Sequence, residues 1–240
     1  MPWKKLALLL ALLIVAGAAY LGLRLYDEML RARSDDPLVW AHAIEAFEAQ
    51  DAKHPPPTDA TLFVGSSSIR FWKTLAEDMA PLVTIRRGFG GARMHDVIHF
   101  ADRLITAYRP ARVVIFVGTN DVNVSDTPME AVALIERGLR SLAQTIHAAR
   151  ADTQIYYVAI TPTPFSWQKR EAVRAANAAA ERVCEEDPRM HFIATEDLFL
   201  TATGEPDTSL FRFDGLHLSP AGYARWTRRL KPLLLDQASR

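Results

Sequence analysis

Cysteine is almost absent from this 240-residue chain, which contains only Cys184. A single cysteine excludes an intrachain disulfide. Cys184 stands in a stretch rich in Ala, Glu and Arg that is typical of a helix, so we interpret it as a small, at least half-buried helix residue and not as a reactive thiol. Cysteine usage therefore leaves the cellular compartment open.

An excess of charge is also lacking, because 28 Lys and Arg residues balance 28 Asp and Glu residues. Proteins that bind the phosphate backbone of nucleic acids usually carry a basic surplus, so we expect no nucleic-acid partner. Internal repeats and low-complexity tracts are absent as well. With 49% apolar and 23% charged residues, the composition is that of a folded protein with one sizeable domain.

One long apolar run is present at the N-terminus, where Leu6 to Leu23 form 18 residues without a charge, between Lys5 and Arg24. As a helix this run would span about 27 Å, close to the roughly 30 Å of a bilayer's hydrocarbon core. We therefore expect one N-terminal transmembrane helix that tethers the protein to a membrane.

A cleaved signal peptide is the alternative for this segment. The stretch from Leu6 to Val15 is followed by the small residues Ala16-Gly17-Ala18, which resemble a cleavage site. Apolar residues continue to Leu23, longer than a signal needs, so we favour the uncleaved anchor. Both interpretations place the rest of the chain outside the cytoplasm, although basic residues flank the run on both sides and leave the orientation open.

Three parts are expected along the chain. Residues 1–24 form the membrane anchor or signal segment. Residues 25–57 contain a juxtamembrane helix, from the helical spacing of residues 36–51, and a proline-rich spacer at 54–57. Residues 58–240 form a single folded domain.

Short apolar runs alternate with longer segments of helical period in this last part. Such an alternation predicts parallel strands joined by helical crossovers, hence a three-layer α/β/α sandwich with a parallel five-stranded sheet of the flavodoxin-like type. The expected strands are residues 61–64, 83–85, 112–117, 155–160 and 191–193, and the main helices between them are residues 92–108, 128–150 and 166–186, with a last helix opening at Ser219-Pro220.

Chemically capable residues follow the expected strands, where ligands bind in such sheets. They form the segments Gly65-Ser66-Ser67, the glycine-rich Arg86 to Gly91, and Gly118-Thr119-Asn120-Asp121, and a fourth segment, Asp214-Gly215-Leu216-His217, lies near the C-terminus. An Asp three residues before a His can accept the Nδ1 proton and raise the basicity of Nε2. Each segment alone is also typical of an ordinary cap, turn or surface pair.

Together and in this order, the four segments resemble those of the SGNH/GDSL hydrolase superfamily over residues 60 to about 236. The resemblance implies the SGNH hydrolase fold and a serine esterase that needs no cofactor. Position by position, it implies Ser67 as nucleophile, His217 as general base and Asp214 as the group that orients it. The backbone N–H groups of Ser67 and Gly91 and the side chain of Asn120 would form the oxyanion hole.

Two positions depart from the family pattern. Ser66 stands where an Asp usually precedes the nucleophile, so the choice of Ser67 among three serines depends on the count from Gly65. Arg86 stands where the second block commonly begins with Asn, which makes the role of Gly91 the least certain. Neither departure removes a group that the reaction requires.

Other groups of residues could form a metal site or a substrate-binding surface. His95 and His99 share a helix face and could bind a metal, but they lack a third ligand at a telling spacing, so we expect no metal site. Trp72, Trp167 and Trp226 could stack on a sugar, although packing is the more typical role of such aromatics. Thr161 to Pro164 could shape a substrate pocket or be a simple loop.

The function expected is hydrolysis of small carboxylic esters, with short acyl groups on carbohydrate or lipid, through an acyl-enzyme intermediate. A lysophospholipase or thioesterase activity, acyl transfer on the same site, and a non-catalytic binding module remain alternatives. Acyl length, alcohol partner and oligomeric state are left open by the sequence.

Overall fold

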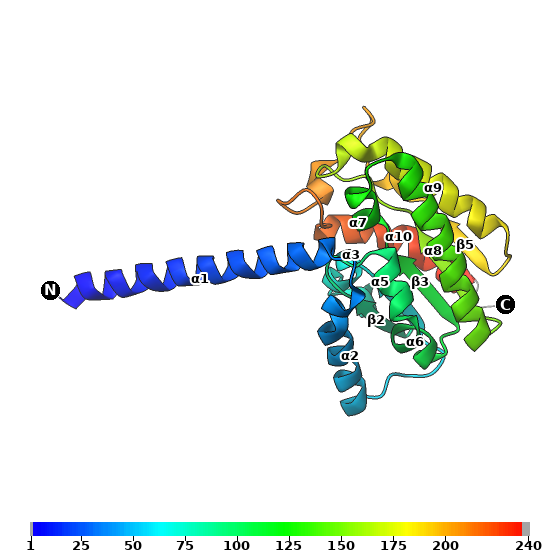
Figure 1. The fold of residues 1–240 in the computed structure, drawn as a ribbon, viewed down its shortest axis with the longest axis horizontal. Coiled ribbons are helices and arrows are strands. Elements are labelled where there is room, and N and C mark those ends of the chain that lie inside the picture. Colours follow the sequence, from blue (N-terminus) through cyan, green and yellow to red (C-terminus); the bar gives the residue numbers. More distant parts are fainter. Residues whose placement is uncertain (1, 237–240) are drawn as a thin grey trace.

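The computed structural model describes residues 2–236, in which one parallel five-stranded sheet lies between two helical layers (Figure 1). The spatial order is β2-β1-β3-β4-β5, and every neighbouring pair is parallel. The predicted three-layer α/β/α sandwich is confirmed. The strands are β1 (Thr61–Gly65), β2 (Thr84–Gly88), β3 (Arg112–Phe116), β4 (Gln154–Val158) and β5 (Met190–Ile193).

Helices connect the strands and cover both faces of the sheet. The α-helices are α1 (Pro2–Arg33), α2 (Ala41–Lys53), α3 (Ser67–Phe71), α4 (Leu75–Met79), α5 (Met94–His99), α6 (Ala101–Leu104), α7 (Thr119–Val124), α8 (Pro128–Ala149), α9 (Arg170–Glu185) and α10 (Pro220–Asp236). Short 3₁₀ turns are η1 (Pro37–Trp40), η2 (Thr106–Tyr108), η3 (Trp167–Lys169), η4 (Glu196–Leu198) and η5 (Thr208–Leu210).

Alternation along the strands builds two separate cores, because successive side chains point to opposite faces. On β1, Leu62 and Val64 join α2, α5, α6, α8 and α9 in one core. Phe63, between them, joins α3, α4 and α10 in the other. On β3, Val113 and Val114 divide in the same way. Both faces of the sheet are thus covered, as parallel sheets require.

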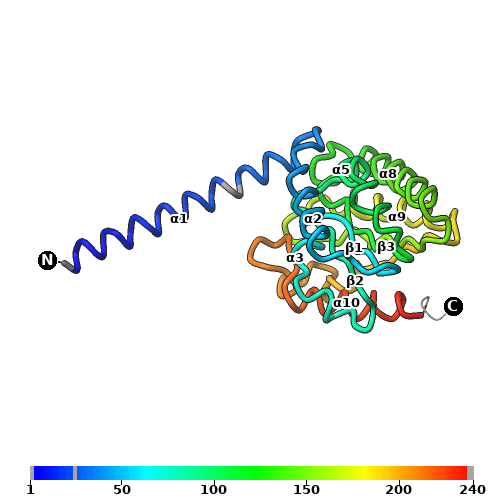
Figure 2. Tube along the Cα trace, turned by 90° about the horizontal axis from the view of Figure 1, so that it is seen from below, coloured from blue at the N-terminus to red at the C-terminus, as the bar shows by residue number. Residues whose placement is uncertain are grey.

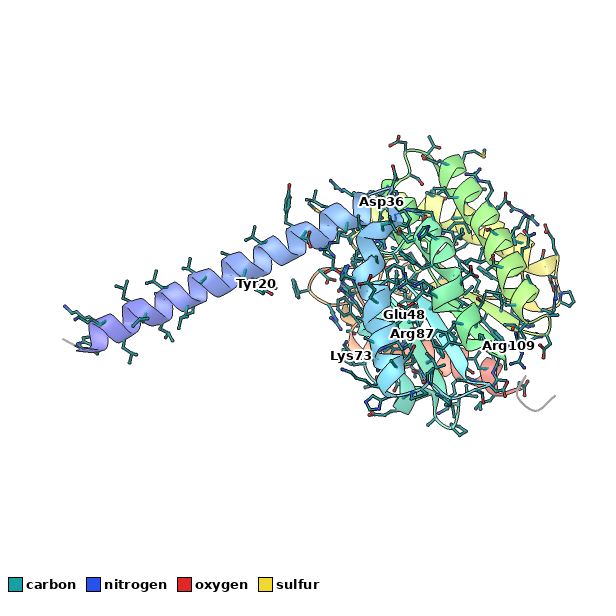
Figure 3. All side chains as sticks on the ribbon, turned by 60° about the horizontal axis from the view of Figure 1, so that its bottom comes forward. Tyr20, Asp36, Glu48, Lys73, Arg87 and Arg109 are labelled. Atoms are coloured by element: carbon teal, nitrogen blue, oxygen red, sulfur yellow. The ribbon has the colours of Figure 1, made fainter. Side chains whose placement is uncertain are left out.

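The N-terminal helix α1 leaves the globular part and projects from it (Figures 1 and 2). Its long apolar stretch has the length and hydropathy of a membrane span, and none of the most apolar window is buried against the rest of the protein. Figure 3 shows side chains standing out along this projecting part. A membrane anchor and a signal sequence both have these properties.

The segment after α1 packs onto the sheet. Trp40, at the end of η1, is 3% exposed and Ile44 of α2 is fully buried, and both belong to the same core as Leu62 of β1. Asp36 caps η1 by accepting a hydrogen bond from the backbone N–H of Leu38. Residues 37–53 therefore contribute apolar contacts to the domain that follows the proline-rich segment.

Two expected elements differ in detail. The second strand extends to Gly88 because Arg86, Arg87 and Gly88 pair with β1. The expected helix 92–108 is divided into α5, α6 and η2, with a break at Phe100 (φ −97°, ψ 11°). At the second break, the hydroxyl of Thr106 donates to the backbone carbonyl of Asp102 (3.2 Å), in competition with the helical backbone bond.

Candidate active site

The end of β1 positions Ser67 at the start of α3. Gly65 has φ +141°, and a Cβ there would lie 1.9 Å from the carbonyl oxygen of Phe116 on β3, so only glycine fits. The next residue, Ser66, donates its backbone N–H to that same carbonyl (3.0 Å). This close approach of β1 and β3 turns the chain and leaves Ser67 half-buried beside the carboxyl edge of the sheet.

Ser67, His217 and Asp214 form one hydrogen-bonded row. Ser67 Oγ lies 2.9 Å from His217 Nε2, and His217 Nδ1 lies 2.8 Å from Asp214 Oδ2. A carboxylate can only accept, so Nδ1 donates to Asp214, and Nε2 is left to accept the hydroxyl proton of Ser67. The structure thus brings together the three residues that the sequence names for catalysis.

A tight turn holds the Asp214 carboxylate under the imidazole. Its Oδ1 accepts the backbone N–H groups of Leu216 and His217, each at 2.9 Å, while Oδ2 accepts from the ring. Partial burial of Asp214 acts to raise the pKa of its carboxyl, but these hydrogen bonds outweigh it and hold the pKa below the ordinary value. Asp214 is therefore ionised near neutral pH and fixes the ring of His217.

Asn120 comes to the same pocket from the end of β3. Gly118, with φ +126°, caps α7, and a Cβ there would lie 2.8 Å from Ile160 and 3.0 Å from the Tyr157 hydroxyl. Asn120 and Ser67 line one narrow pocket. The Asn120 Nδ2 donates one hydrogen to the carbonyl of Ala92 (2.9 Å). The second hydrogen on this nitrogen makes no hydrogen bond within residues 2–236.

Gly91 lies next to this contact but is not among the residues lining the pocket of Ser67 and Asn120. Its φ is +68°, and a Cβ would lie 2.6 Å from the Cβ of Ala32 in α1 and 3.1 Å from Trp40. The glycine therefore lets the end of the N-terminal helix pack directly on the glycine-rich loop. The bond from Asn120 to Ala92 joins that loop to α7.

Asp121 is a buried support of the site to which the sequence assigns no role of its own. Only 2% exposed, it accepts the backbone N–H of Met94 at 3.0 and 3.1 Å, and so ties α7 to the start of α5. Burial raises the pKa of the Asp121 carboxyl to about 6, although the Met94 N–H and the neighbouring Arg93 and His95 charges lower it. Ionising this group in place disfavours the folded state.

Replacing Asp121 with asparagine is expected to stabilise the protein relative to wild type as pH rises. The pKa of the Asp121 carboxyl in the folded protein lies above its unfolded value near 4, so the wild-type protein loses stability as pH rises from about 4 to 7. The asparagine variant does not lose this stability, because its side chain does not ionise. A shift of two pKa units corresponds to a change of about 3 kcal/mol in the difference between the free energies of unfolding of the two proteins.

Denaturant unfolding of both proteins in detergent, at pH 4 and pH 7, measures this difference. Asp126→Asn, at an exposed carboxyl in the same segment, controls for loss of a negative charge. A difference between Asp121→Asn and wild type that stays constant over this pH range would contradict the account.

The other candidate groups have structural roles or lie apart from Ser67. His95 Nε2 is 3.1 Å from Asp96 Oδ1, and residues 2–236 contain no group of three or more His, Cys, Asp or Glu side chains able to hold a metal. Trp72 is buried in the core against α10 and Trp226 is buried within that helix, which confirms packing for these two. Cys184 is 4% exposed within α9, which confirms a buried helix residue, and this burial raises the pKa of its thiol to about 12.

Arg86, which stands where the family commonly has Asn, is held in the edge strand β2. Arg86 Nη1 donates to the backbone carbonyl of Trp72 at 2.5 Å. Its neighbour Arg87 is buried, with an ion pair to Asp51 and a hydrogen bond to the hydroxyl of Tyr108 (2.7 Å). The departure from the family pattern thus falls in a strand that holds both arginines in place.

A parallel α/β sandwich with a serine, a histidine and a carboxylate in one hydrogen-bonded row beyond its strands is an architecture of hydrolases. The chain belongs to the GDSL-like lipase/acylhydrolase family, whose model matches residues 58–225. It is 27% identical over 211 residues to the platelet-activating factor acetylhydrolase IB subunit alpha1 of Rattus norvegicus, covering 82% of each chain. The human protein of that name is 26% identical over 204 residues, covering 82% of this chain and 83% of its own.

Solved structures share the fold. A GDSL-like lipase from Bacteroides thetaiotaomicron superimposes with a TM-score of 0.65 at 16% identity, covering 81% of this chain and 98% of its own. A catalytic mutant of an acetylxylan esterase from Geobacillus stearothermophilus gives 0.58 at 18% identity, covering 72% and 93%. Membership of the family supports a hydrolase of the lipase/acylhydrolase kind.

Proposed function

We propose that this protein is a serine esterase that hydrolyses carboxylic esters through Ser67, His217 and Asp214. The observation that supports this most is the hydrogen-bonded row from Ser67 Oγ through the imidazole to the Asp214 carboxylate. A serine hydroxyl is a weak nucleophile near neutral pH, and it becomes reactive when an adjacent base takes its proton as it attacks. The row provides that base and the group that orients it.

The proposed reaction has two steps. Ser67 Oγ bonds to the ester carbonyl carbon while His217 Nε2 takes the hydroxyl proton, and the tetrahedral intermediate collapses as that proton passes to the leaving alcohol. Water then attacks the acyl-enzyme with the same histidine as base, which releases the acid and restores Ser67. Asp214 keeps its charge throughout and stabilises the imidazolium formed in each step.

The oxyanion of each intermediate would be held by the backbone N–H groups of Ser67 and Gly91 and by Asn120 Nδ2. Each such donor typically contributes about 2.7–4 kcal/mol of transition-state stabilisation. The position of Asn120 in the pocket of Ser67 supports its part in this set. Gly91 is supported by the bond from Asn120 to the carbonyl of its neighbour Ala92.

A short acyl group fits the proposed site best. The narrow pocket at Ser67 is closed by Phe116, Thr161, Thr163 and Leu216 among others. These side chains leave little room for a long chain beside the nucleophile. Two relatives are named for acetyl esters, an acetylhydrolase and an acetylxylan esterase, which supports the same choice. Acyl transfer to an acceptor other than water would use the same groups.

We propose also that α1 anchors the enzyme in a membrane, with the catalytic domain outside the cytoplasm. Its apolar stretch is exposed along its whole length. The segment of residues 200–216, which leads into the Asp214–His217 turn, lies on the side of the domain from which α1 projects (Figures 1 and 2). Phe165 and Phe213 are exposed beside this turn. The proposed site would therefore open near the bilayer.

Labelling with a fluorophosphonate tests the catalytic assignment. An activated serine attacks phosphorus and displaces fluoride, while His217 accepts the hydroxyl proton, so we expect one covalent adduct on the full-length protein in detergent. Peptide mass spectrometry should locate the adduct on Ser67. Absence of labelling, or an adduct on Ser66 or Ser68, would contradict the proposed nucleophile.

A further inference from the structure

Two arginine side chains flank an aromatic ring beside the His217 imidazole. The ring of Phe71, at the end of α3, meets the His217 ring edge-on with centroids 4.8 Å apart. The guanidinium carbon of Arg70 lies 4.5 Å from the Phe71 centroid, and that of Arg212 lies 4.8 Å from it. Each cation is thus separated from the imidazole by a single ring.

Further positive groups lie close by. Arg86 Nη1 binds the carbonyl of Trp72, the residue after Phe71. Lys73 follows and is exposed at the edge of the domain (Figure 3). Arg70, Lys73 and Arg86 line the same groove. Burial lowers the pKa of Lys73, and the positive charges of Arg86, Arg70 and Arg212 lower it further. Like charges at short range destabilise the folded protein unless an anion binds them.

Carboxylates do not balance this cluster among residues 2–236. Glu28 of α1 pairs with Arg70 Nη2 at 2.5 Å. Asp214 is held by His217, and Asp78 Oδ2 accepts hydrogen bonds from the Trp72 indole and from Thr74. One carboxylate therefore faces four cations in the described part of the chain.

Not every side-chain donor in the cluster has a partner. Arg70 Nε is buried and has no hydrogen-bond partner within the described residues. Over the same residues, the side chain of Arg212 makes one hydrogen bond, from Nε to the carbonyl of Leu218 (3.2 Å), and no ion pair with a carboxylate. Arginine N–H groups suit phosphate because the planar guanidinium can donate two parallel bonds.

The cluster also lies beside the His217 imidazole and the glycine-rich loop, the two parts of the proposed site that a substrate must contact. Arg70 lies on the glycine-rich loop, since a Cβ at Gly90 would be 2.8 Å from its guanidinium carbon and 1.9 Å from Glu28 Oε1. Arg70, Lys73 and Arg86 line an open groove that continues from Gly90 along the edge strand β2. An ester whose carbonyl reached Ser67 could extend its alcohol part toward this groove.

We propose that Arg70, Lys73, Arg86 and Arg212 form an anion subsite around Phe71, which binds a phosphate group on the alcohol part of the ester. This inference rests on the proposed esterase function and specifies its substrate class. Phosphate-bearing esters would be preferred over neutral esters such as acetylated sugars. A lipid headgroup and a soluble sugar or glycerol phosphate supply the same chemistry.

A matched substrate pair tests the subsite on the full-length protein in neutral detergent. 1-Acetylglycerol 3-phosphate and 1-acetylglycerol differ only in the phosphate, and acetate release is measured for both. We expect kcat/KM to be at least about tenfold higher for the phosphate ester, as for hydrogen bonds to a charged group. The preference should act mainly on KM and should decrease as salt is raised.

The double variant Lys73→Gln/Arg212→Gln should bring the ratio of the two kcat/KM values close to one. Both side chains are exposed, and thermal unfolding checks that the variant is folded. Arg137→Gln, at an exposed cation on α8, is the matched control and should keep the wild-type ratio. Repeating the comparison with 1-palmitoylglycerol 3-phosphate and 1-palmitoylglycerol distinguishes a lipid source from a soluble one.

The outcomes separate the two proposals. Hydrolysis of both esters without a preference, or a preference that the double variant retains, overturns the anion subsite and leaves the esterase in place. If neither ester is hydrolysed and fluorophosphonate does not label Ser67, the proposed function fails and the subsite fails with it.

Discussion

Ser67→Ala is expected to reduce turnover of 4-nitrophenyl acetate by at least about 10⁴-fold, because removing the nucleophile of a Ser-His-Asp triad abolishes the acyl-enzyme route. Binding and the remaining oxyanion donors account for the activity that persists. The Ser67 hydroxyl makes its hydrogen bond with His217, so its loss leaves the backbone of α3 intact. Steady-state kinetics on purified full-length protein, with thermal unfolding to verify the fold, measure the effect.

The neighbouring serine supplies a matched control. Ser68 is 8% exposed, and it contributes its backbone carbonyl, not its hydroxyl, as acceptor for the Tyr223 hydroxyl (2.8 Å). Ser68→Ala should therefore keep the turnover of wild type. Near-normal activity in Ser67→Ala, or a comparable loss in Ser68→Ala, would move the nucleophile away from Ser67.

His217→Ala is expected to cost as much as Ser67→Ala, and the double variant should lose little beyond either single change. Residues that act as one unit in a reaction show such non-additive losses. His99→Ala, at an exposed histidine on α5, is the control for removing an imidazole, and it also tests the metal alternative, since a chelator and this change should both leave turnover intact. Additive losses would indicate that Ser67 and His217 act independently.

Asp214→Asn should lower kcat by about 10⁴-fold with the fold retained. The amide can still accept the backbone N–H groups of Leu216 and His217, which the carboxylate now binds. The amide supplies no negative charge to His217 Nδ1. The tautomer that carries its proton on Nδ1, and leaves Nε2 free to accept the serine proton, is then no longer favoured. A kcat within tenfold of wild type would show that the carboxylate does not orient the base.

Local chemistry made the Asp214–His217 pair predictable from the sequence, whereas the catalytic roles were implied by the family resemblance of four segments taken together. The Asp214–His217 pair is three residues apart, and a turn through Gly215 (φ +63°) is enough to close its hydrogen bond. The alternation of apolar runs with helical segments likewise predicted the parallel sheet, because it follows from short-range periodicity. The break at Phe100 escaped prediction, since apolar spacing continues through it while the backbone bonds change partner.

The residues that surround the hydrogen-bonded row of Ser67, His217 and Asp214 could not be predicted from the sequence. Phe71 against His217, Arg212 against Phe71 and Glu28 against Arg70 join parts of the chain that share no local motif. Gly91 resembles any loop glycine in the sequence. Its close approach to Ala32 exists only because the C-terminal end of α1 packs against the glycine-rich loop.

The amino-acid sequence by itself determined the elements, their parallel order and the turn chemistry at each strand end, since periodicity, caps and positive-φ glycines act over a few residues. Only the tertiary structure decided that a serine hydroxyl lies 2.9 Å from an imidazole 150 residues later, and that Arg70 and Arg212 pack on the Phe71 ring beside that imidazole. Contacts of that kind depend on how two helical layers pack on a twisted sheet, and no local preference encodes such a distance.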